Sequence, residues 1–311
     1  MSMFDPANLR SYSGSSDLSR IMHFAGECNK LADFCCSLHP GDVGHFLSNG
    51  LAGRDPAPYC FIYESNGNLE ALVLFHAIRS SSWGLLVHPH RRDAPLETAL
   101  VAWAEHHLRH LLTATGSATE WITSEALACD TPRRDVLSSR GYVAEPASDF
   151  FLTTRSLQGE IPGSVLPDGF SMRAVAGEHE ADEVQAVHVS AFGRAWQPGE
   201  YLQVMRSPSF HSERELVMVA PDGRFAAFLV YWIDPISKSG LFEPVGCHPD
   251  FQRRGLTKAL MYEGMRRMAA RGMTTALVVH EAPDANPASA ALYRSVGFTP
   301  KYGSHEYRQQ R

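Results

Sequence analysis

The chain has 311 residues, of which 44% are hydrophobic and 20% are charged, and its formal net charge is −6. This length accommodates two domains of ordinary size, and the composition is that of a globular protein rather than a disordered one. The acidic balance argues against a broad nucleic-acid-binding surface. Because no apolar run has the length of a transmembrane helix and the start lacks a signal peptide, we expect a cytoplasmic protein that binds neither nucleic acid nor membrane.

The two halves of the chain share a sequence pattern. The segment from His88-Pro89 to Leu100 aligns without a gap on the segment from His248-Pro249 to Leu260, and further on Gly141 aligns with Gly297 at nearly the same offset. Two matches in the same order indicate a tandem duplication.

We therefore divide the chain into a domain at 1–157, a linker at 158–168 and a second domain at 169–311. The linker is rich in Pro and Gly and shows little hydrophobic periodicity. Each domain alternates strands with helices, and the fold class is α/β, mixed and α+β-like.

The first half begins with β-rich runs and ends in helical patterns. We expect strands at 59–63, 69–79 and 84–87, a long helix at 96–112 and a short helix at 132–139.

The second half repeats this order. Strands are expected at 215–220 and 225–233, separated by the turn Pro221-Asp222-Gly223, then at 241–247 and 274–279, with helices at 255–271 and 287–296. Gly272 closes the first of these helices as its C-cap.

The sharpest local pattern is the loop that joins the strand at 241–247 to the helix that follows. Unpaired backbone N–H groups and the helix dipole favour an anion at such a position. Gly255 permits close approach of the backbone, and the nearby cations are Arg253, Arg254 and Lys258. Diphosphate is the anion that this loop is expected to bind.

A second motif, from Asn286 to Phe298, follows one helix and one strand downstream. Together the two motifs resemble the acyl-CoA-binding core of the GNAT superfamily of N-acyltransferases, with Q/R-x-x-G-x-G/A at Gln252 to Thr257 and N-x-x-A-x-x-L-Y-x-x-x-G-F at Asn286 to Phe298. Thr257 departs from the Gly or Ala that the family favours, and we expect its hydroxyl to bond a phosphate oxygen. The resemblance covers about residues 169–309 and implies two GNAT-type domains, each with a mixed, mostly antiparallel sheet flanked by helices.

The resemblance also implies residue roles. In the family the strand before the loop separates from its neighbour and bonds the pantetheine arm of acetyl-CoA, the co-substrate. The expected acetyl-CoA-binding residues are Val245, Gly246, Cys247, Gln252, Arg253, Arg254, Gly255, Leu256, Thr257, Lys258 and Asn286. Tyr293 would lie near the thioester sulfur and protonate the leaving thiolate.

The attacking amine must be neutral, so the site needs a base. Glu243 shares a strand face with Leu241 and Val245, whereas Glu281 ends the next strand. Both carboxylates are candidates, and we favour Glu243.

The first half lacks the same chemistry. Pro95 stands in the place of Gly255 and offers no N–H to a phosphate, while Asp93 and Glu97 add negative charge there. The first domain is therefore expected to be a degenerate copy without an intact CoA loop.

Three further expectations concern single residue types. The six cysteines form no C-x-x-C pair and are expected to be reduced core thiols. His106 and His110 lie one helical turn apart but lack an evident third ligand, so no metal site is expected. Aromatic residues at Phe192, Trp196, Tyr201, Tyr231 and Trp232 suggest an aromatic wall beside the acceptor.

The function that these patterns favour is an acetyl-CoA-dependent N-acetyltransferase that acts on a small-molecule amine by direct attack in a ternary complex. The alternatives are a protein or peptide N-acetyltransferase and a CoA-binding, non-catalytic regulatory module. The chain is expected to be a monomer or a homodimer.

Overall fold

The computed structural model describes residues 4–311 apart from 37, 52, 79, 93 and 194–195. Among the helices of this part, none is long and apolar enough to span a bilayer. The N-terminal half contains β1 (Leu9–Ser11), α1 (Ser15–Leu31), α2 (Pro40–His45), β2 (Cys60–Ser65), β3 (Asn68–Phe75), β4 (Ser82–Val87), α3 (Ala94–Ala114), β5 (Trp121–Leu127), α4 (Thr131–Ser139) and β6 (Val143–Ser156). The C-terminal half contains β7 (Ser171–Ala174), α5 (Ala181–Phe192), α6 (Glu200–Met205), β8 (Glu215–Val219), β9 (Phe225–Asp234), β10 (Ser239–Cys247), α7 (Leu256–Ala270), β11 (Thr275–Glu281), α8 (Pro287–Ser295) and β12 (Thr299–Gln310).

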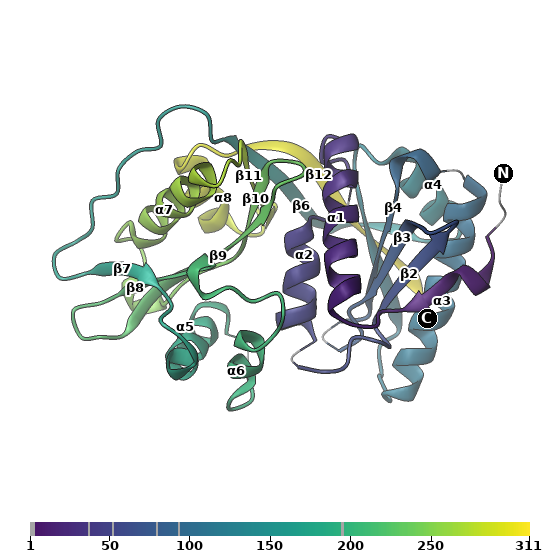
Figure 1. Cartoon of the computed structure of the whole chain (residues 1–311), viewed down its shortest axis with the longest axis horizontal. Helices are drawn as coiled ribbons and strands as arrows, with labels where there is room; N and C mark the ends of the chain where they lie inside the picture. The colour runs from purple at the N-terminus through teal and green to yellow at the C-terminus, as the bar shows by residue number, and fades with distance from the viewer. Residues whose placement is uncertain (1–3, 37, 52, 79, 93, 194–195) are drawn as a thin grey trace.

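All of these strands form one 12-stranded sheet in the order β1-β2-β3-β4-β5-β12-β6-β11-β10-β9-β8-β7 (Figure 1). The sheet is mixed and mostly antiparallel with helices on its faces, as predicted, and its parallel pairs are β4–β5 and β10–β11. The last strand of each half is exchanged: β12 pairs with β5 of the N-terminal half, and β6 pairs with β11 of the C-terminal half. The two predicted sheets are therefore joined into one.

The predicted duplication is visible in the backbone. In each half a short helical turn follows the strand that precedes the long helix. His88 caps the turn in the first half by accepting a hydrogen bond from the N–H of His90 at 3.3 Å, and His248 does the same with the N–H of Asp250 at 3.1 Å. The shared His-Pro pair thus forms the same cap in both halves.

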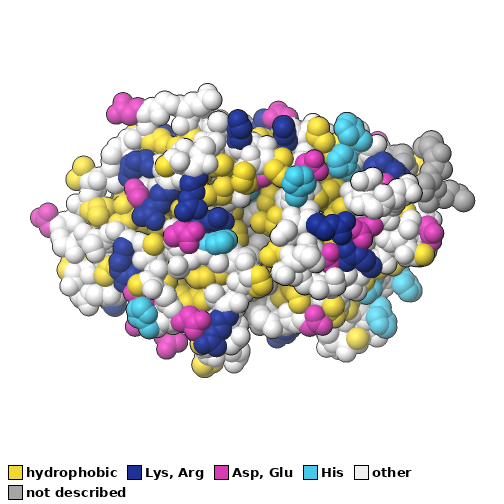
Figure 2. Space-filling view, in the orientation of Figure 1, with side chains coloured by type: hydrophobic (Ala, Val, Ile, Leu, Met, Phe, Trp, Pro, Cys, Tyr) yellow, Lys and Arg dark blue, Asp and Glu magenta, His cyan; other side chains and the backbone are white. Residues whose placement is uncertain are grey.

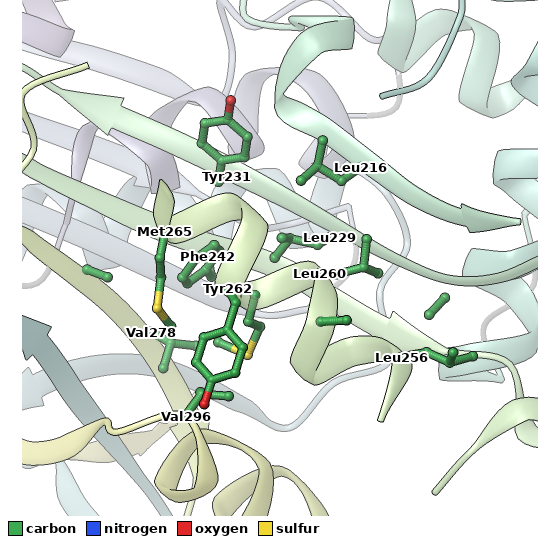
Figure 3. Close-up of a cluster of buried hydrophobic side chains, with 14 of the residues drawn as sticks. Leu216, Leu229, Tyr231, Phe242, Leu256, Leu260, Tyr262, Met265, Val278 and Val296 are labelled. Atoms are coloured by element: carbon green, nitrogen blue, oxygen red, sulfur yellow. The ribbon is translucent and has the colours of Figure 1, made fainter. Parts of the chain in front are cut away.

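The main core of the C-terminal half lies between α7 and the sheet (Figure 3). Leu260 and Met265 of α7 are fully buried against Leu229 of β9 and Phe242 of β10. The apolar spacing that predicts the helix is the spacing that faces this core. Gly264 allows the close contact, since an added Cβ would lie 2.7 Å from the ring of Phe242.

The opposite face of the C-terminal sheet is covered by α5 and α6 and, beside them, by α2 of the N-terminal half. Helix α2 packs on β9, and glycine makes this approach possible: a Cβ on Gly41 would lie 2.7 Å from the side chain of Trp232, and one on Gly44 would lie 2.6 Å from its ring. His39, at the start of α2, hydrogen-bonds the Ser239 hydroxyl of β10 at 2.9 Å. Segments of the N-terminal half therefore form part of the surroundings of β10.

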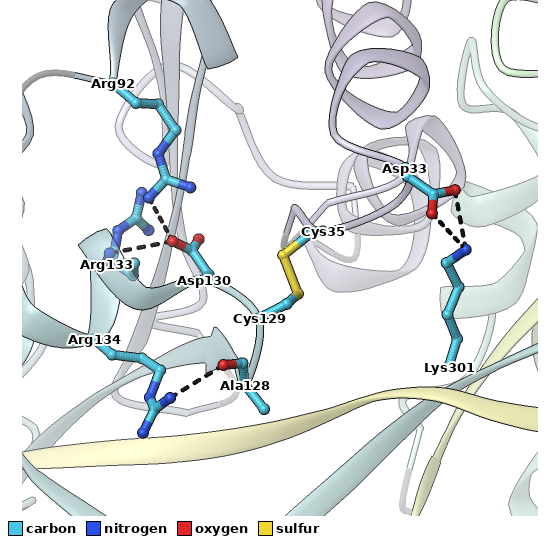
Figure 4. Close-up of a disulfide and its surroundings, with 9 residues drawn as sticks. All are labelled: Asp33, Cys35, Arg92, Ala128, Cys129, Asp130, Arg133, Arg134 and Lys301. Atoms are coloured by element: carbon cyan, nitrogen blue, oxygen red, sulfur yellow. Dashed lines mark hydrogen bonds and ion pairs between the residues drawn. A yellow bond between two sulfur atoms is a disulfide. The ribbon is translucent and has the colours of Figure 1, made fainter.

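The prediction that all six cysteines are reduced is wrong for Cys35 and Cys129, which form a disulfide (Figure 4). Cys35 lies between α1 and α2, and Cys129 lies between β5 and α4. The fold brings their Cα atoms to 6.1 Å although 94 positions separate them in the sequence, so spacing gave no signal. The free thiols are Cys28, Cys36, Cys60 and Cys247.

Candidate active site

The site is built around an opening between β10 and β11. These strands pair in parallel from Ser239–Leu241 to Thr275–Leu277. Further on, β10 remains paired with β9 through Val245–Cys247, whereas β11 remains paired with β6 as far as Glu281. The two strands therefore diverge, and Val245–Cys247 faces the opening without pairing to β11, as the sequence analysis expected of this segment.

The loop before α7 is exposed from Gln252 to Gly255. Arg253 and Gly255 both have a left-handed backbone, with φ of 62° and 78°. A Cβ built on Gly255 meets no atom within 4 Å, so the space in front of the loop is open. The first intrahelical bond runs from the N–H of Ala259 to the carbonyl of Gly255, which leaves the preceding amides free to bind an anion. Both properties fit a bound diphosphate.

Three cations surround this loop. Arg254 donates to the carbonyl of Asp250 at 3.2 Å, and the Lys258 Nζ lies 5.8 Å from the centre of the Tyr262 ring. Within the described residues, Arg253 forms no ion pair. On the face shown in Figure 2, Lys and Arg side chains gather over the region of α7, although the chain as a whole is acidic.

Leu256 and Thr257, two of the predicted acetyl-CoA-binding residues, both have side chains that contact other parts of the protein. Leu256 is 1% exposed and its side chain belongs to the core, so its amide is the group that faces the loop. The side chain of Thr257 hydrogen-bonds the thiol of Cys247, and burial raises the pKa of that thiol. The Thr257 hydroxyl thus already has a partner on β10.

Glu243 lies where β10 shifts its register against β9, and its carbonyl accepts a hydrogen bond from Trp232 Nε1 at 2.8 Å. Its side chain is hydrogen-bonded to that of Asp42, on α2 of the N-terminal half. Burial raises the pKa of both carboxyls, and the negative charge of Glu243 raises that of Asp42 further. We expect such a pair to retain one proton near neutral pH.

Tyr293 of α8 is 8% exposed, and its ring centre lies 5.1 Å from that of His280. Burial raises its pKa, and the charge of Glu243 adds to this effect, which means that the two side chains are near each other. No group in the described part of the chain hydrogen-bonds the phenol. The hydroxyl therefore stays protonated and is free to donate.

Asn286 and Glu281 are hydrogen-bonded to each other. The Asn286 side chain caps α8 by accepting from the N–H of Ser289 at 3.1 Å, and it donates to Glu281 Oε2 at 2.9 Å. Glu281 is exposed. Of the two predicted bases, Glu243 is the one in an enclosed position close to Tyr293.

A cavity of about 470 Å³ opens beside Glu243. It is lined by residues of both halves, including the carboxyl side chains Asp42, Glu125, Glu243 and Glu306. We call it the acidic cavity. Val279 of β11 also lines it, so the cavity reaches the opening between β10 and β11.

Comparison with known proteins agrees with this geometry. Residues 181–298, which include the loop, the diverging strands and α8, match the acetyltransferase (GNAT) family. The C-terminal half of the chain is therefore similar to the GNAT acetyltransferases. Curated relatives include the mycothiol acetyltransferase of Nocardia farcinica, 29% identical over 269 residues, which are 80% of this chain and 82% of the relative. That of Saccharomonospora viridis is 26% identical over 239 residues, 72% and 73% of the two chains.

Solved structures support the fold of this acetyltransferase over its whole length. A GCN5-related N-acetyltransferase from Sphaerobacter thermophilus superimposes with a TM-score of 0.65 at 20% identity, covering 97% of this chain and 95% of that one. A tandem GNAT protein from the clavulanic acid biosynthesis pathway gives 0.65 at 13% identity, covering 97% and 98%. The protein is thus an acyl-CoA-dependent acetyltransferase with a tandem fold.

In the N-terminal half of this acetyltransferase, the place equivalent to the loop holds ion pairs (Figure 4). Glu97 is 1% exposed and pairs with Arg92 at 2.7 Å and with Arg133. Arg92 also pairs with Asp130 at 2.7 Å. The expectation that Glu97 presents free negative charge is therefore wrong, because two arginines neutralise it. Asp93 lies outside the described residues.

The aromatic residues do not enclose a pocket of substrate size. Tyr201, Tyr231 and Trp232 line a cavity of about 20 Å³, which has room for about one water molecule. Phe192 is 53% exposed. These side chains chiefly pack, and the acidic cavity is the larger space beside the opening.

Sequence reasoning missed Asp42, Glu125 and Glu306, which the fold brings to Glu243. Asp42 follows His39-Pro40-Gly41, a helix start in which its carboxylate accepts from the His39 N–H. A capping role explains that pattern fully, so nothing in it indicated a contact with the other half.

Proposed function

We propose that this acetyltransferase transfers an acetyl group from acetyl-CoA to an amine of a small molecule, by direct attack in a ternary complex. The observation that carries the proposal is the position of the β10–β11 opening, with the Gly255 loop following β10 and the acidic cavity beside Glu243. Two substrates that approach from these directions meet near Tyr293.

Acetyl-CoA supplies the acetyl thioester. The amides between Arg253 and Lys258 would hold its diphosphate, and the unpaired edge of Val245–Cys247 would bond its pantetheine arm. Asn286 would contact the same arm through the second hydrogen of its side-chain amide, which the hydrogen bonds to Glu281 and Ser289 do not use. The left-handed loop and the open space before Gly255 support this assignment.

Glu243 is the proposed base and Tyr293 the proposed acid. Glu243 accepts one proton from the ammonium form of the acceptor, and the neutral nitrogen then forms the new bond to the acetyl carbon. The nitrogen releases a second proton to solvent, from which Tyr293 regains the proton that it gives to the sulfur. The carbon–sulfur bond breaks, and Tyr293 donates a hydrogen bond and then a proton to the sulfur. The products are the N-acetyl compound and the free thiol.

A small-molecule acceptor is favoured over a protein. The acidic cavity is lined by elements of both halves, and the named relatives are mycothiol acetyltransferases. We also propose a single acetyl-CoA site per chain, because Pro95 and the Arg92–Glu97–Arg133 ion pairs occupy the equivalent place in the N-terminal half.

The test is release of free thiol from acetyl-CoA with a panel of small amines and peptides. Turnover with small amines and none with peptides is the expected result. Binding of acetyl-CoA without turnover of any acceptor would favour the non-catalytic module instead.

A further inference from the structure

The acidic cavity contains four carboxyl groups, which form two pairs. One is the hydrogen-bonded pair Asp42–Glu243 beside the opening. The other is Glu125 of β5 and Glu306 of β12, which are directly opposite each other in the antiparallel register. Directly opposite residues have Cβ atoms about 5 Å apart, so these two carboxyls repel each other when both are charged.

Among the described residues no Lys or Arg lines this cavity, and its basic side chains are those of His45 and His76. None of the four carboxyls forms an ion pair with a Lys or Arg there. His76 also lines the cavity, but burial lowers its pKa to about 4, so it is neutral at pH 7. The reduced hydration of Glu125 in the cavity lining and the nearby charges of Glu306 and Asp42 raise its pKa to about 7.

A hydroxyl gives a second, independent indication of a ligand. Ser124 lines the same cavity and is 1% exposed, and its Oγ has no hydrogen-bond partner. Buried hydroxyl groups in proteins normally have a hydrogen-bond partner, so the unpaired Ser124 hydroxyl indicates a ligand that would supply one.

The carboxyls themselves are accessible from the cavity. Glu125 is exposed, and Asp42, Glu243 and Glu306 are partly exposed. Within the described residues, no three His, Cys, Asp or Glu side chains come close enough to hold a metal ion. Two carboxyl pairs that line one cavity fit an organic cation with charges at two points.

We propose that the acceptor is a small polyamine, and that Glu125 and Glu306 form a subsite for its second ammonium group. The amine to be acetylated would lie at the Asp42–Glu243 pair, and Ser124 would bond a polar group between the two ends. This inference rests on the proposed transfer to a small amine and adds the class of amine. The subsite is shared, since Glu125 comes from the N-terminal half and Glu306 from the C-terminal half.

The first experiment compares kcat/KM for acceptors matched in size but differing in charge. Cadaverine is compared with pentylamine, and streptamine with glucosamine, which distinguishes linear polyamines from amino sugars. We expect the kcat/KM of at least one diamine to exceed that of its matched monoamine by about tenfold or more. Equal values within both pairs would overturn the subsite while leaving the acetyltransferase function in place, whereas no turnover of any amine would contradict the proposed function itself.

The second experiment uses Glu125→Gln and Glu306→Gln, with Glu160→Gln in the exposed linker as the control. Both cavity variants should lose most of the preference for the diamine, and the control should keep it. Direct binding of cadaverine, measured by calorimetry without acetyl-CoA, should weaken in parallel.

Stability provides a readout that is independent of turnover. Because Glu125 and Glu306 repel each other, either substitution should raise the Tm of the unliganded protein, and cadaverine should raise the Tm of the wild-type protein more than that of the variants. A lower Tm in both variants, with diamine preference intact, would assign the two glutamates to the fold and overturn the subsite.

Discussion

Glu243 and Tyr293 reach the β10–β11 opening from different layers of the molecule. Glu243 contacts Asp42 on α2, while Tyr293 belongs to the core that α7 and α8 form with the sheet. An acid and a base in these positions can act on opposite sides of one reacting centre. Sequence patterns made both residues candidates, because each lies in or beside a local motif, and their roles stay predictions. Asp42 was not identified, because its relation to Glu243 exists only in the folded chain.

Replacing Tyr293 with Phe removes the hydroxyl and keeps the ring in the core. We expect kcat to fall about 100-fold with little change in the affinity for acetyl-CoA. Steady-state kinetics and calorimetry on the same preparation measure both. A large loss of stability with unchanged kcat would assign Tyr293 to packing alone.

Replacing Glu243 with Gln removes the proposed base. Because the pKa of Glu243 is raised, the wild-type rate should increase with pH as Glu243 loses its proton, at a pH above the usual glutamate range of about 4.3. Glu243→Gln should lose this limb, so its rate deficit should be largest above the pKa of Glu243 and should shrink at lower pH, where the wild-type carboxyl is protonated as well. A pH–rate profile checks both.

Glu281→Gln is the matched comparison for that experiment. It removes a carboxylate that is exposed and bonded to Asn286, so the rate should change little. If Glu281→Gln is the damaging variant, the assignment of the base is wrong although the transfer chemistry remains.

At the scale of elements, the helices and strands around the loop were predictable. The turn at Pro221-Asp222-Gly223, the apolar spacing of α7 and the cap residue Asn286 are all local signals, and β8, β9, α7 and α8 begin and end within a few residues of the expected positions. The register shift at Glu243 was not predictable, because it depends on contacts with β9.

Gly255→Val tests the loop. Valine at a φ of 78° is strained, and its side chain would occupy the open space before α7, so acetyl-CoA binding should be lost. Gly223→Val is the control, since its φ is 88° and an added Cβ there also meets nothing within 4 Å. Both variants should be destabilised similarly, but calorimetry should detect acetyl-CoA binding in the Gly223 variant. Binding that survives in the Gly255 variant would contradict the loop assignment.

At the scale of the whole molecule, the duplication was readable from the sequence and the joining of the halves was not. Alternating apolar residues indicate that β6 and β12 are strands, but they do not say which strand each one pairs with. The Cys35–Cys129 disulfide escaped prediction for a related reason, because two loops distant in sequence meet only after folding.

One acetyl-CoA should bind per chain. At a hundredfold excess over Kd, a single site raises the free energy of unfolding by about 2.7 kcal/mol, which is a measurable increase in Tm. Calorimetry gives the stoichiometry, and a value of two would contradict the proposal for the N-terminal half.

Thiol titration of the denatured, unreduced protein should detect the four free cysteines rather than all six. Cys129→Ser should lower the free energy of unfolding by about 2–4 kcal/mol. The control is Cys247→Ser, which replaces a partly exposed free thiol. Cys60→Ser is unsuitable because Cys60 is fully buried. Titration of six thiols would exclude the disulfide.

The exchange of β6 and β12 also has a consequence for how the protein is made. Trp121 of β5 pairs with Gln310, next to the last residue of the chain. During synthesis β5 therefore exposes an unpaired edge until β12 has left the ribosome, and such an edge invites association with other chains. We expect the two halves to join only after β12 has been made, and a nascent chain that stalls before β12 to be a target for chaperones.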